Sequence, residues 1–105
     1  MSWHDALDAF IAEVRKAYGP RLVSVVLYGS RARGEATVES DVDVLVVLEN
    51  YDDFWHEHDR VVEIAGRSLT EHGVLISARP ARRDDYERRR DPFFMNVRRE
   101  GKLVG

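Results

Sequence analysis

The apolar residues of this chain recur in two patterns, one helical and one typical of buried strands. Over residues 3–18 they return every three or four positions, which predicts an amphipathic helix. Ser2 stands where it can cap the start of that helix, and the pair Gly19-Pro20 ends it. Residues 22–28 (LVSVVLY) are short, β-branched and almost wholly apolar, so they predict a strand buried on both faces.

Helix patterns and strand patterns also follow one another in the middle of the chain. Residues 29–40 are small and polar, and they predict a loop with one helical turn after Ser30. Residues 42–48 predict a second buried strand, and residues 53–71 predict a second helix with a capping Asn or Asp just before it. The core-facing residues expected on this helix are Phe54, His58, Val61, Val62, Ala65 and Leu69.

The last part of the chain predicts one more strand and two more helical segments. The second helix closes at Gly73, a third strand covers residues 74–78, and Pro80 breaks it. A short polar helix over residues 83–90 precedes a segment from Pro92 that docks on the core. The docking residues expected in that segment are Phe93, Phe94, Val97 and Leu103. This order of elements predicts an α/β fold, a small sandwich in which helices cover a mixed sheet of three or four strands.

Length and composition narrow the class of protein. A chain of 105 residues buries one core, so residues 1–105 are expected to form a single domain. No apolar run approaches the roughly 20 residues of a membrane span, and the N-terminus lacks the pattern of a signal peptide. Cysteine is absent, which excludes disulfides and thiolate metal sites and fits a reducing cytoplasm. We therefore expect a cytoplasmic protein with no membrane contact.

The net charge of −3 conceals an asymmetry along the chain. Residues 1–75 carry 7 basic and 14 acidic side chains, whereas residues 76–105 carry 9 basic and 5 acidic ones. The basic part includes Arg79 and the run Arg88-Arg89-Arg90, which can face an acidic partner, a nucleotide or RNA, or simply solvent. With a pI near 5.8, general binding of nucleic acid is the weaker expectation.

Two carboxylates open the second predicted strand. Side chains at positions i and i+2 of a strand share a face, so Asp41 and Asp43 project together. Two carboxylates on one side of a buried strand repel each other unless a positive charge lies between them. A hard divalent cation such as Mg²⁺, which also takes water and phosphate oxygens as ligands, meets that need. The alternative is structural: Asp41 caps a turn while Asp43 pairs with Arg31 or Arg33.

A phosphate-binding pattern directly follows the first predicted strand. Gly29 lets a backbone N–H group approach an anion closely, and Ser30 supplies a hydroxyl donor. Arg31 and Arg33 offer forked donors to a triphosphate. A Gly-Ser pair alone is a common turn, and its value here lies in its spacing to the two aspartates. If the two strands are neighbours, the phosphate donors and the metal carboxylates converge, which suits a nucleoside triphosphate bound with Mg²⁺.

The spacing of Gly29-Ser30, ten residues, then Asp41-x-Asp43 resembles the signature of the nucleotidyltransferase superfamily that includes DNA polymerase β and kanamycin nucleotidyltransferase. The longer string GSRARGEA…SDVDVLV is similar to its smallest branch, the minimal nucleotidyltransferase (MNT) proteins of prokaryotes. Their MntA-like antitoxins are commonly encoded beside a HEPN-domain toxin. The resemblance implies the small polymerase β-like nucleotidyltransferase fold.

The resemblance also implies a reaction and a set of site residues. The expected reaction transfers a nucleoside monophosphate, AMP from ATP, to a hydroxyl acceptor while pyrophosphate leaves. By position, Gly29 and Ser30 hold the β- and γ-phosphates, while Asp41 and Asp43 ligate Mg²⁺ and are catalytic. In MNT antitoxins the acceptor is a tyrosine of the HEPN toxin, so a HEPN-domain partner is expected here.

One feature departs from the family pattern. Active members usually carry a third carboxylate on a later strand, but residues 74–78 (VLISA) contain no acid, and Leu75 or Ser77 takes its place. Glu71, Asp84 and Asp85 lie just outside that strand and are the acids that could replace it. The enzyme is then slow, borrows an acid, or binds nucleotide without catalysis, since losing a general base costs about 10²–10⁴-fold.

Two further functions compete with the antitoxin enzyme. One is a binding module that neutralises its partner by complex formation alone. The other is a small-molecule nucleotidyltransferase, against which the lack of a second, acceptor-binding domain counts. His56 and His58 do not share a helix face, so a zinc site is not expected. The aromatic residues of so small a domain cannot all be buried, which favours a homodimer or a partner protein.

Overall fold

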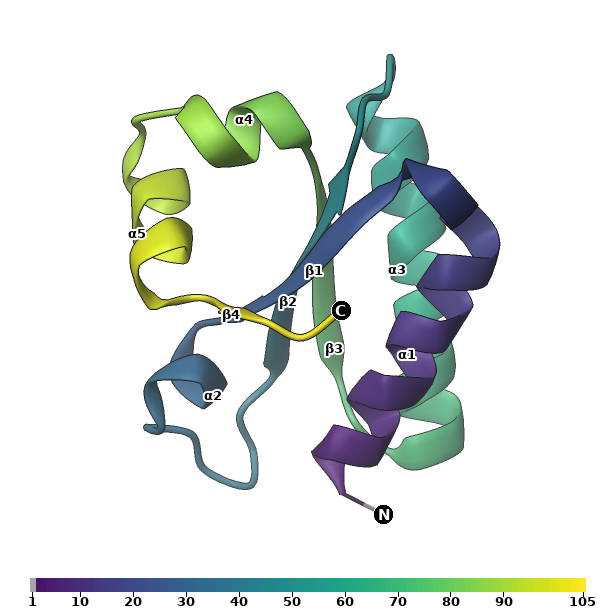
Figure 1. Cartoon of the computed structure of the whole chain (residues 1–105). Coiled ribbons are helices and arrows are strands. Elements are labelled where there is room, and N and C mark those ends of the chain that lie inside the picture. Colours follow the sequence, from purple (N-terminus) through teal and green to yellow (C-terminus); the bar gives the residue numbers. More distant parts are fainter. Residues whose placement is uncertain (1) are drawn as a thin grey trace.

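A computed structural model describes residues 2–105 and shows helices on both faces of a sheet (Figure 1). Helix α1 (Trp3–Tyr18) begins at Ser2, whose hydroxyl accepts from the backbone N–H of Asp5 while the Asp5 carboxylate accepts from the N–H of Ser2. This reciprocal capping box confirms the predicted start. Gly19, at φ +55°, ends the helix and opens a short 3₁₀ turn, η1 (Gly19–Arg21).

The sheet has four strands in the order β3-β2-β1-β4. Strands β1 (Leu22–Tyr28) and β2 (Val42–Leu48) pair antiparallel, so the end of β1 meets the start of β2. Strand β3 (Ile76–Arg82) pairs parallel with β2, and the short β4 (Lys102–Leu103) pairs antiparallel with β1. The sheet is therefore mixed, as predicted, and the fold is α/β.

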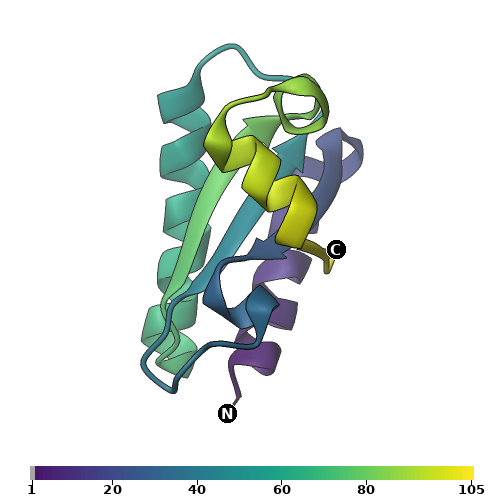
Figure 2. The ribbon, with the colours of Figure 1, turned by 90° about the vertical axis from the view of Figure 1, so that its left-hand side faces the viewer.

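The two faces of the sheet are covered by different helices (Figures 1 and 2). Helices α1 and α3 (Phe54–His72) cover one face, where the even-numbered valines of β2 lie in the larger core cluster. Helix α5 (Pro92–Glu100) covers the other face, where Leu45 and Val47 pack against Phe94 and Val97. Helices α2 (Ser30–Arg33) and α4 (Arg83–Arg88) are short and lie at opposite ends of β2. This alternation places the side chain of Asp43 on the α5 face.

The third strand continues through Pro80, so the prediction that Pro80 breaks it is wrong. Strand β3 lies at the edge of the sheet and pairs with only one neighbour, with Pro80 opposite Val46. An edge strand tolerates proline because the missing N–H can face away from the partner strand. The strand therefore continues past Pro80 to Arg82. It also begins at Ile76, two residues later than predicted.

The core-facing side of α3 also differs from the prediction. Val62 and Leu69, which were expected to face the core, are 44% and 52% exposed. Leu103 of β4, which was expected to dock on the core, is exposed as well. The buried residues of α3 are Glu57, Val61, Ile64, Ala65 and Ser68. An apolar-only pattern could not place a glutamate in this row, because the burial of Glu57 depends on partners distant in sequence.

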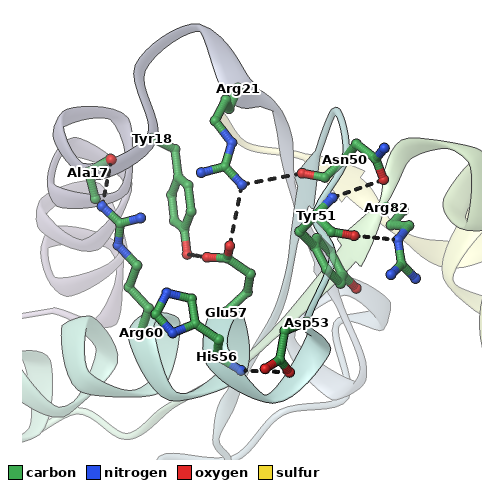
Figure 3. A network of polar contacts seen from close by, with 10 residues as sticks. All are labelled: Ala17, Tyr18, Arg21, Asn50, Tyr51, Asp53, His56, Glu57, Arg60 and Arg82. Atoms are coloured by element: carbon green, nitrogen blue, oxygen red, sulfur yellow. Dashed lines mark hydrogen bonds and ion pairs between the residues drawn. The ribbon is translucent and has the colours of Figure 1, made fainter.

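Those partners form the polar network of Figure 3. The Tyr18 hydroxyl donates to Glu57 Oε1 at 3.0 Å, and Arg21 Nη2 donates to Glu57 Oε2 at 3.3 Å and to the backbone oxygen of Asn50. Burial and the neighbouring Glu57 raise the pKa of Tyr18 well above its usual value. The network joins α1, η1 and α3 beside the end of β2 opposite Asp43. Asp53 caps α3 by accepting from the N–H groups of Trp55 and His56.

Within residues 2–105, no helix is both long enough and apolar enough to cross a membrane.

Candidate functional site

Gly29 and Asp43 meet where β1 ends and β2 begins. Gly29 has φ +76° and ψ −157°, and it forms the turn between β1 and α2, with its carbonyl accepting from the N–H groups of Ala32 and Arg33 at 3.1 Å each. A Cβ atom built on Gly29 would collide with Asp43 Oδ2. Only glycine therefore fits between the strand end and the carboxylate, and the structure brings the two halves of the predicted motif together.

Asp41 and Asp43 form a pair of carboxylates at the start of β2. Asp43 is partly buried and lies in register with Tyr28 of β1 and Ser77 of β3, while Asp41 is exposed. Burial and then the charge of Asp41 raise the pKa of Asp43, and Arg33 offsets part of this effect. Among the described residues, no ion pair neutralises Asp43. A bound cation would remove this repulsion.

The two arginines of the motif contact other groups than Asp43. Arg31 Nη2 donates to the backbone oxygens of Thr37 (3.2 Å) and Ser40 (2.9 Å), and its guanidinium lies over the Trp3 ring at 4.9 Å. Arg33 pairs with Glu100 of α5 at 3.0 Å and with Glu35 at 3.3 Å. Arg31 therefore braces the loop over residues 35–41, and Arg33 joins α2 to α5. Either arginine can bind a phosphate directly only if it first breaks these contacts.

Of the two residues expected in place of the third carboxylate, Leu75 or Ser77, the structure puts Ser77 beside Asp43. It pairs in register with Asp43 and shares its face of the sheet, whereas Leu75 precedes β3. Asp84 and Asp85 follow the end of β3, which pairs with the far end of β2, so the expectation that they reach the site is wrong. Glu71 lines a separate hollow between α1 and α3. No group of three or more potential His, Cys, Asp or Glu ligands occurs within residues 2–105.

The donor set fits a hard cation only in part. Two carboxylates, one of which has a pKa raised by burial and by the charge of the other, suit an ion that completes its shell with water and phosphate oxygens. They do not suit an ion held by protein ligands alone. Asp41 and Asp43 therefore fit a divalent cation that arrives with a nucleotide.

Two hollows without a common lining residue lie near the start of β2. The smaller has a volume of about 240 Å³ and includes Tyr28, Gly29, Arg33, Phe93 and Glu100 in its lining. The larger has a volume of about 790 Å³ and lies between the loop over residues 36–41, the end of α3 and the start of α1. Asp41 lines the larger hollow. Asp41 therefore faces the larger hollow, while the smaller one reaches the turn at Gly29 beside Asp43.

An aromatic cluster around Arg79 was not predicted from the sequence. This side chain follows Ser77 on the same face of β3, and its guanidinium carbon lies 4.2 Å from the centroid of Phe93. Its Nε atom is buried with no hydrogen-bond partner in the described part of the chain. Phe93 in turn meets Tyr28 edge-on at 5.5 Å. No sequence signal connects these residues, since Tyr28, Arg79 and Phe93 come from three separate elements.

Several other arginines of the basic part, residues 76–105, also bond to groups within the fold. Arg82 donates to the backbone oxygen of Tyr51, and Arg83 pairs with Glu49 at 2.7 Å and with Glu87 at 2.9 Å. Arg88 pairs with Asp84 one turn earlier on α4. The run is therefore a partly paired surface and gives little support to nucleic-acid binding.

Comparison with known proteins shows the family to which the chain belongs. Residues 7–92 match the family described as nucleotidyltransferase domain. The chain is 30% identical over 105 residues, or 99% of both chains, to a candidate protein adenylyltransferase of Methanocaldococcus jannaschii, MJ0604. A second one from that organism, MJ1305, is 43% identical over 75 residues, which cover 70% of this chain and 51% of that protein.

The chain therefore belongs to the nucleotidyltransferase-domain family, and it is a nucleotidyltransferase related to proteins named as protein adenylyltransferases. Its fold is also that of solved nucleotidyltransferases. A Sulfolobus solfataricus structure matches 94% of this chain and 76% of its own, with a TM-score of 0.63 and 21% identity. A toxin–antitoxin structure with AMP-PNP matches 90% of this chain and 68% of its own, with a TM-score of 0.60 and 18% identity.

Proposed function

We propose that this chain transfers AMP from ATP to a tyrosine hydroxyl of a partner protein, a HEPN-domain toxin, and so acts as its antitoxin in the cytoplasm. The observation that carries the proposal is the contact between Gly29 and Asp43, since it joins a phosphate-binding turn to a metal-binding carboxylate. Residues 1–105 serve as one minimal transferase domain. The relatives named as protein adenylyltransferases support a protein acceptor, and the toxin–antitoxin structure with AMP-PNP supports ATP as the donor.

Each motif residue has a stated part in the proposed reaction. The N–H groups of the turn at Gly29 and the Ser30 hydroxyl bind the β- and γ-phosphates, and Asp41 and Asp43 hold Mg²⁺. When bound, the ion neutralises phosphate charge and favours departure of pyrophosphate. Arg33 lies near enough to add positive charge once it leaves Glu100.

The reaction forms a bond between the acceptor oxygen and the α-phosphorus. The bond from the α-phosphorus to the bridging oxygen breaks, and pyrophosphate leaves with that electron pair. Because Ser77 cannot act as the base, the acceptor proton passes to water. Most of the catalytic effect then comes from positioning and charge neutralisation.

The test incubates the purified chain with ATP labelled at the α-phosphate, Mg²⁺ and the product of the neighbouring gene. Label is expected on that protein, and Asp43→Ala should abolish it. Asp8→Ala is the matched control, because Asp8 is an exposed aspartate of α1 outside the site. Persistence of labelling in Asp43→Ala would refute the assignment of Asp43.

A binding module without catalysis is the second candidate, and the serine at position 77 favours it. The double variant Asp41→Asn/Asp43→Asn separates the two functions. If that variant still neutralises and co-purifies with the partner, complex formation alone accounts for the antitoxin effect. If neutralisation is lost while the complex persists, the transfer reaction is required.

A further inference from the structure

The larger of the two hollows beside the aspartates exposes apolar side chains next to a catalytic carboxylate. Three of the seven large apolar residues that are exposed in the described chain line it. Val38 is 97% exposed, Leu69 52% and Leu75 49%. Trp3 and Val74 add partly buried apolar surface to the same hollow. A small domain gains nothing by gathering such residues at one place unless a partner covers them.

The wall that carries Val38 is held in place by its own hydrogen bonds. The Thr37 N–H donates to Ser40 Oγ at 2.9 Å, and the Ser40 N–H donates to the Thr37 carbonyl at 3.1 Å. Arg31 donates to the carbonyls of both residues. These bonds close a tight turn with Val38 at its tip. The outward position of Val38 is therefore fixed by the turn before any partner binds.

Phosphoryl transfer needs separate places for the acceptor and for the departing phosphates. In the proposed reaction the attacking and leaving oxygens stand roughly in line on opposite sides of the α-phosphorus. Gly29, where the departing phosphates bind, lines the smaller hollow under α5. The acceptor then needs an approach that the departing phosphates do not fill. The larger hollow, which Asp41 lines and which α1 and α3 border, shares no lining residue with the smaller one.

The charge of the larger hollow indicates the chemistry of its occupant. Glu39 is exposed at its border, and no ion pair to it is found among residues 2–105, whereas the charge of Asp41 is taken up by the bound metal. The cation in the lining, Arg31, is already bonded to two carbonyls and stacked on Trp3. The surface is therefore apolar with an acidic border, and it complements a segment with apolar side chains and basic neighbours.

We propose that the hollow lined by Val38, Leu69 and Leu75 docks the acceptor protein, through a segment that carries apolar and basic residues beside the hydroxyl to be modified. This inference rests on the proposed function, because it names the surface that brings the acceptor to Asp41 and Asp43. It predicts that affinity for the acceptor and affinity for ATP are set by different residues, which line different hollows.

The test measures transfer kinetics with the product of the neighbouring gene as acceptor. Val38→Ser and Leu69→Ser should each raise the KM for that protein about tenfold, the loss expected from one apolar contact in an interface. ATP binding, measured by titration calorimetry, should stay within about twofold. Val62→Ser is the matched control, because Val62 is equally an exposed apolar residue of α3 but does not line the hollow. It should change neither quantity.

A charge-reversal variant tests the basic character of the partner. Glu39→Lys should raise the KM and reduce its dependence on salt, because it removes a favourable charge at the border of the hollow. An unchanged KM in Val38→Ser and Leu69→Ser would overturn the docking surface. An unchanged KM in Glu39→Lys would overturn the basic segment. Because Val38 is almost fully exposed, its variant folds, and thermal melting of Leu69→Ser controls for instability.

Other outcomes separate this inference from the proposed function. If the wild-type chain labels no protein, the proposed function fails, and the inference falls with it. If labelling occurs and only the docking variants behave as wild type, the inference alone fails. If these variants dissolve a homodimer without changing the KM, the hollow is a self-interface and the inference is wrong.

Discussion

Replacing Gly29 by alanine tests the contact on which the site depends. At φ +76° and ψ −157°, Gly29 lies in a backbone region that other residues hardly populate, and adopting it costs about 1–3 kcal/mol. The new Cβ would also collide with Asp43 Oδ2, so the carboxylate must move. A misplacement of about 1 Å in a catalytic group can cost about 10²-fold in rate. Gly29→Ala should therefore lose both stability and nearly all transfer.

Gly34 provides a matched control on the other end of α2. It also has φ +76°, but its ψ of 18° places it in the left-handed helical region, and an added Cβ would meet nothing within 4 Å. Gly34→Ala should cost about 1–2 kcal/mol of stability and leave transfer almost unchanged.

The assay compares both variants by urea unfolding and by transfer from labelled ATP at saturating acceptor. The expected result is a stability loss in both variants and a loss of transfer of about 10²-fold in Gly29→Ala alone. If Gly29→Ala retains the activity of Gly34→Ala, Asp43 does not act from the position that the structure gives it, and the reasoning is refuted.

Three further predictions concern single side chains. Because burial and Asp41 raise the pKa of Asp43, its protonated form favours folding, and this contribution is lost as pH rises through the raised pKa. Asp43→Asn should thus raise the melting temperature at pH 7 without metal, and this gain should vanish below about pH 3.8. An equal gain at both pH values would contradict the raised pKa of Asp43. Glu57→Ala should cost roughly 2–3 kcal/mol in urea unfolding, because Tyr18 and Arg21 lose a buried acceptor, while transfer per folded molecule stays unchanged. Glu63→Ala is the control, because Glu63 is an exposed residue of the same helix. An equal loss of unfolding free energy in both variants would show that the network adds nothing to stability. Ser77→Asp should increase the transfer rate at least about tenfold by adding the missing carboxylate opposite Asp43, and an unchanged rate would place the missing group elsewhere.

Much of the fold could be predicted because local patterns decide it. The apolar spacing of α1 and the valine- and leucine-rich run of β2 each specify an element without distant partners. Asp41 and Asp43 could be placed on one strand face for the same reason, since alternation is a property of the strand itself. The turn at Ser30 and the glycine that ends α3 follow from local backbone preferences, and the structure confirms both.

The errors arose where long-range contacts outweigh local pattern. Pro80 continues β3 because the strand lies at an edge, and strand order cannot be read from the sequence of β3 alone. Glu57 is buried because Tyr18 and Arg21 fold against it, so apolar periodicity misplaced the core face of α3. Asp84 looked close to the site in sequence, yet the parallel pairing of β2 and β3 puts it at the far end of the sheet.

The most direct measurement compares two forms of labelled ATP, one carrying the label on the α-phosphate and one on the γ-phosphate. Each is incubated with the chain, Mg²⁺ and the product of the neighbouring gene. A nucleotidyltransferase leaves the α-phosphate on the acceptor and releases the γ-phosphate with pyrophosphate. We therefore expect the acceptor to carry only the α-label, and none in Asp43→Ala. Transfer of the γ-label, or an α-label that persists in Asp43→Ala, would contradict the assigned reaction and site.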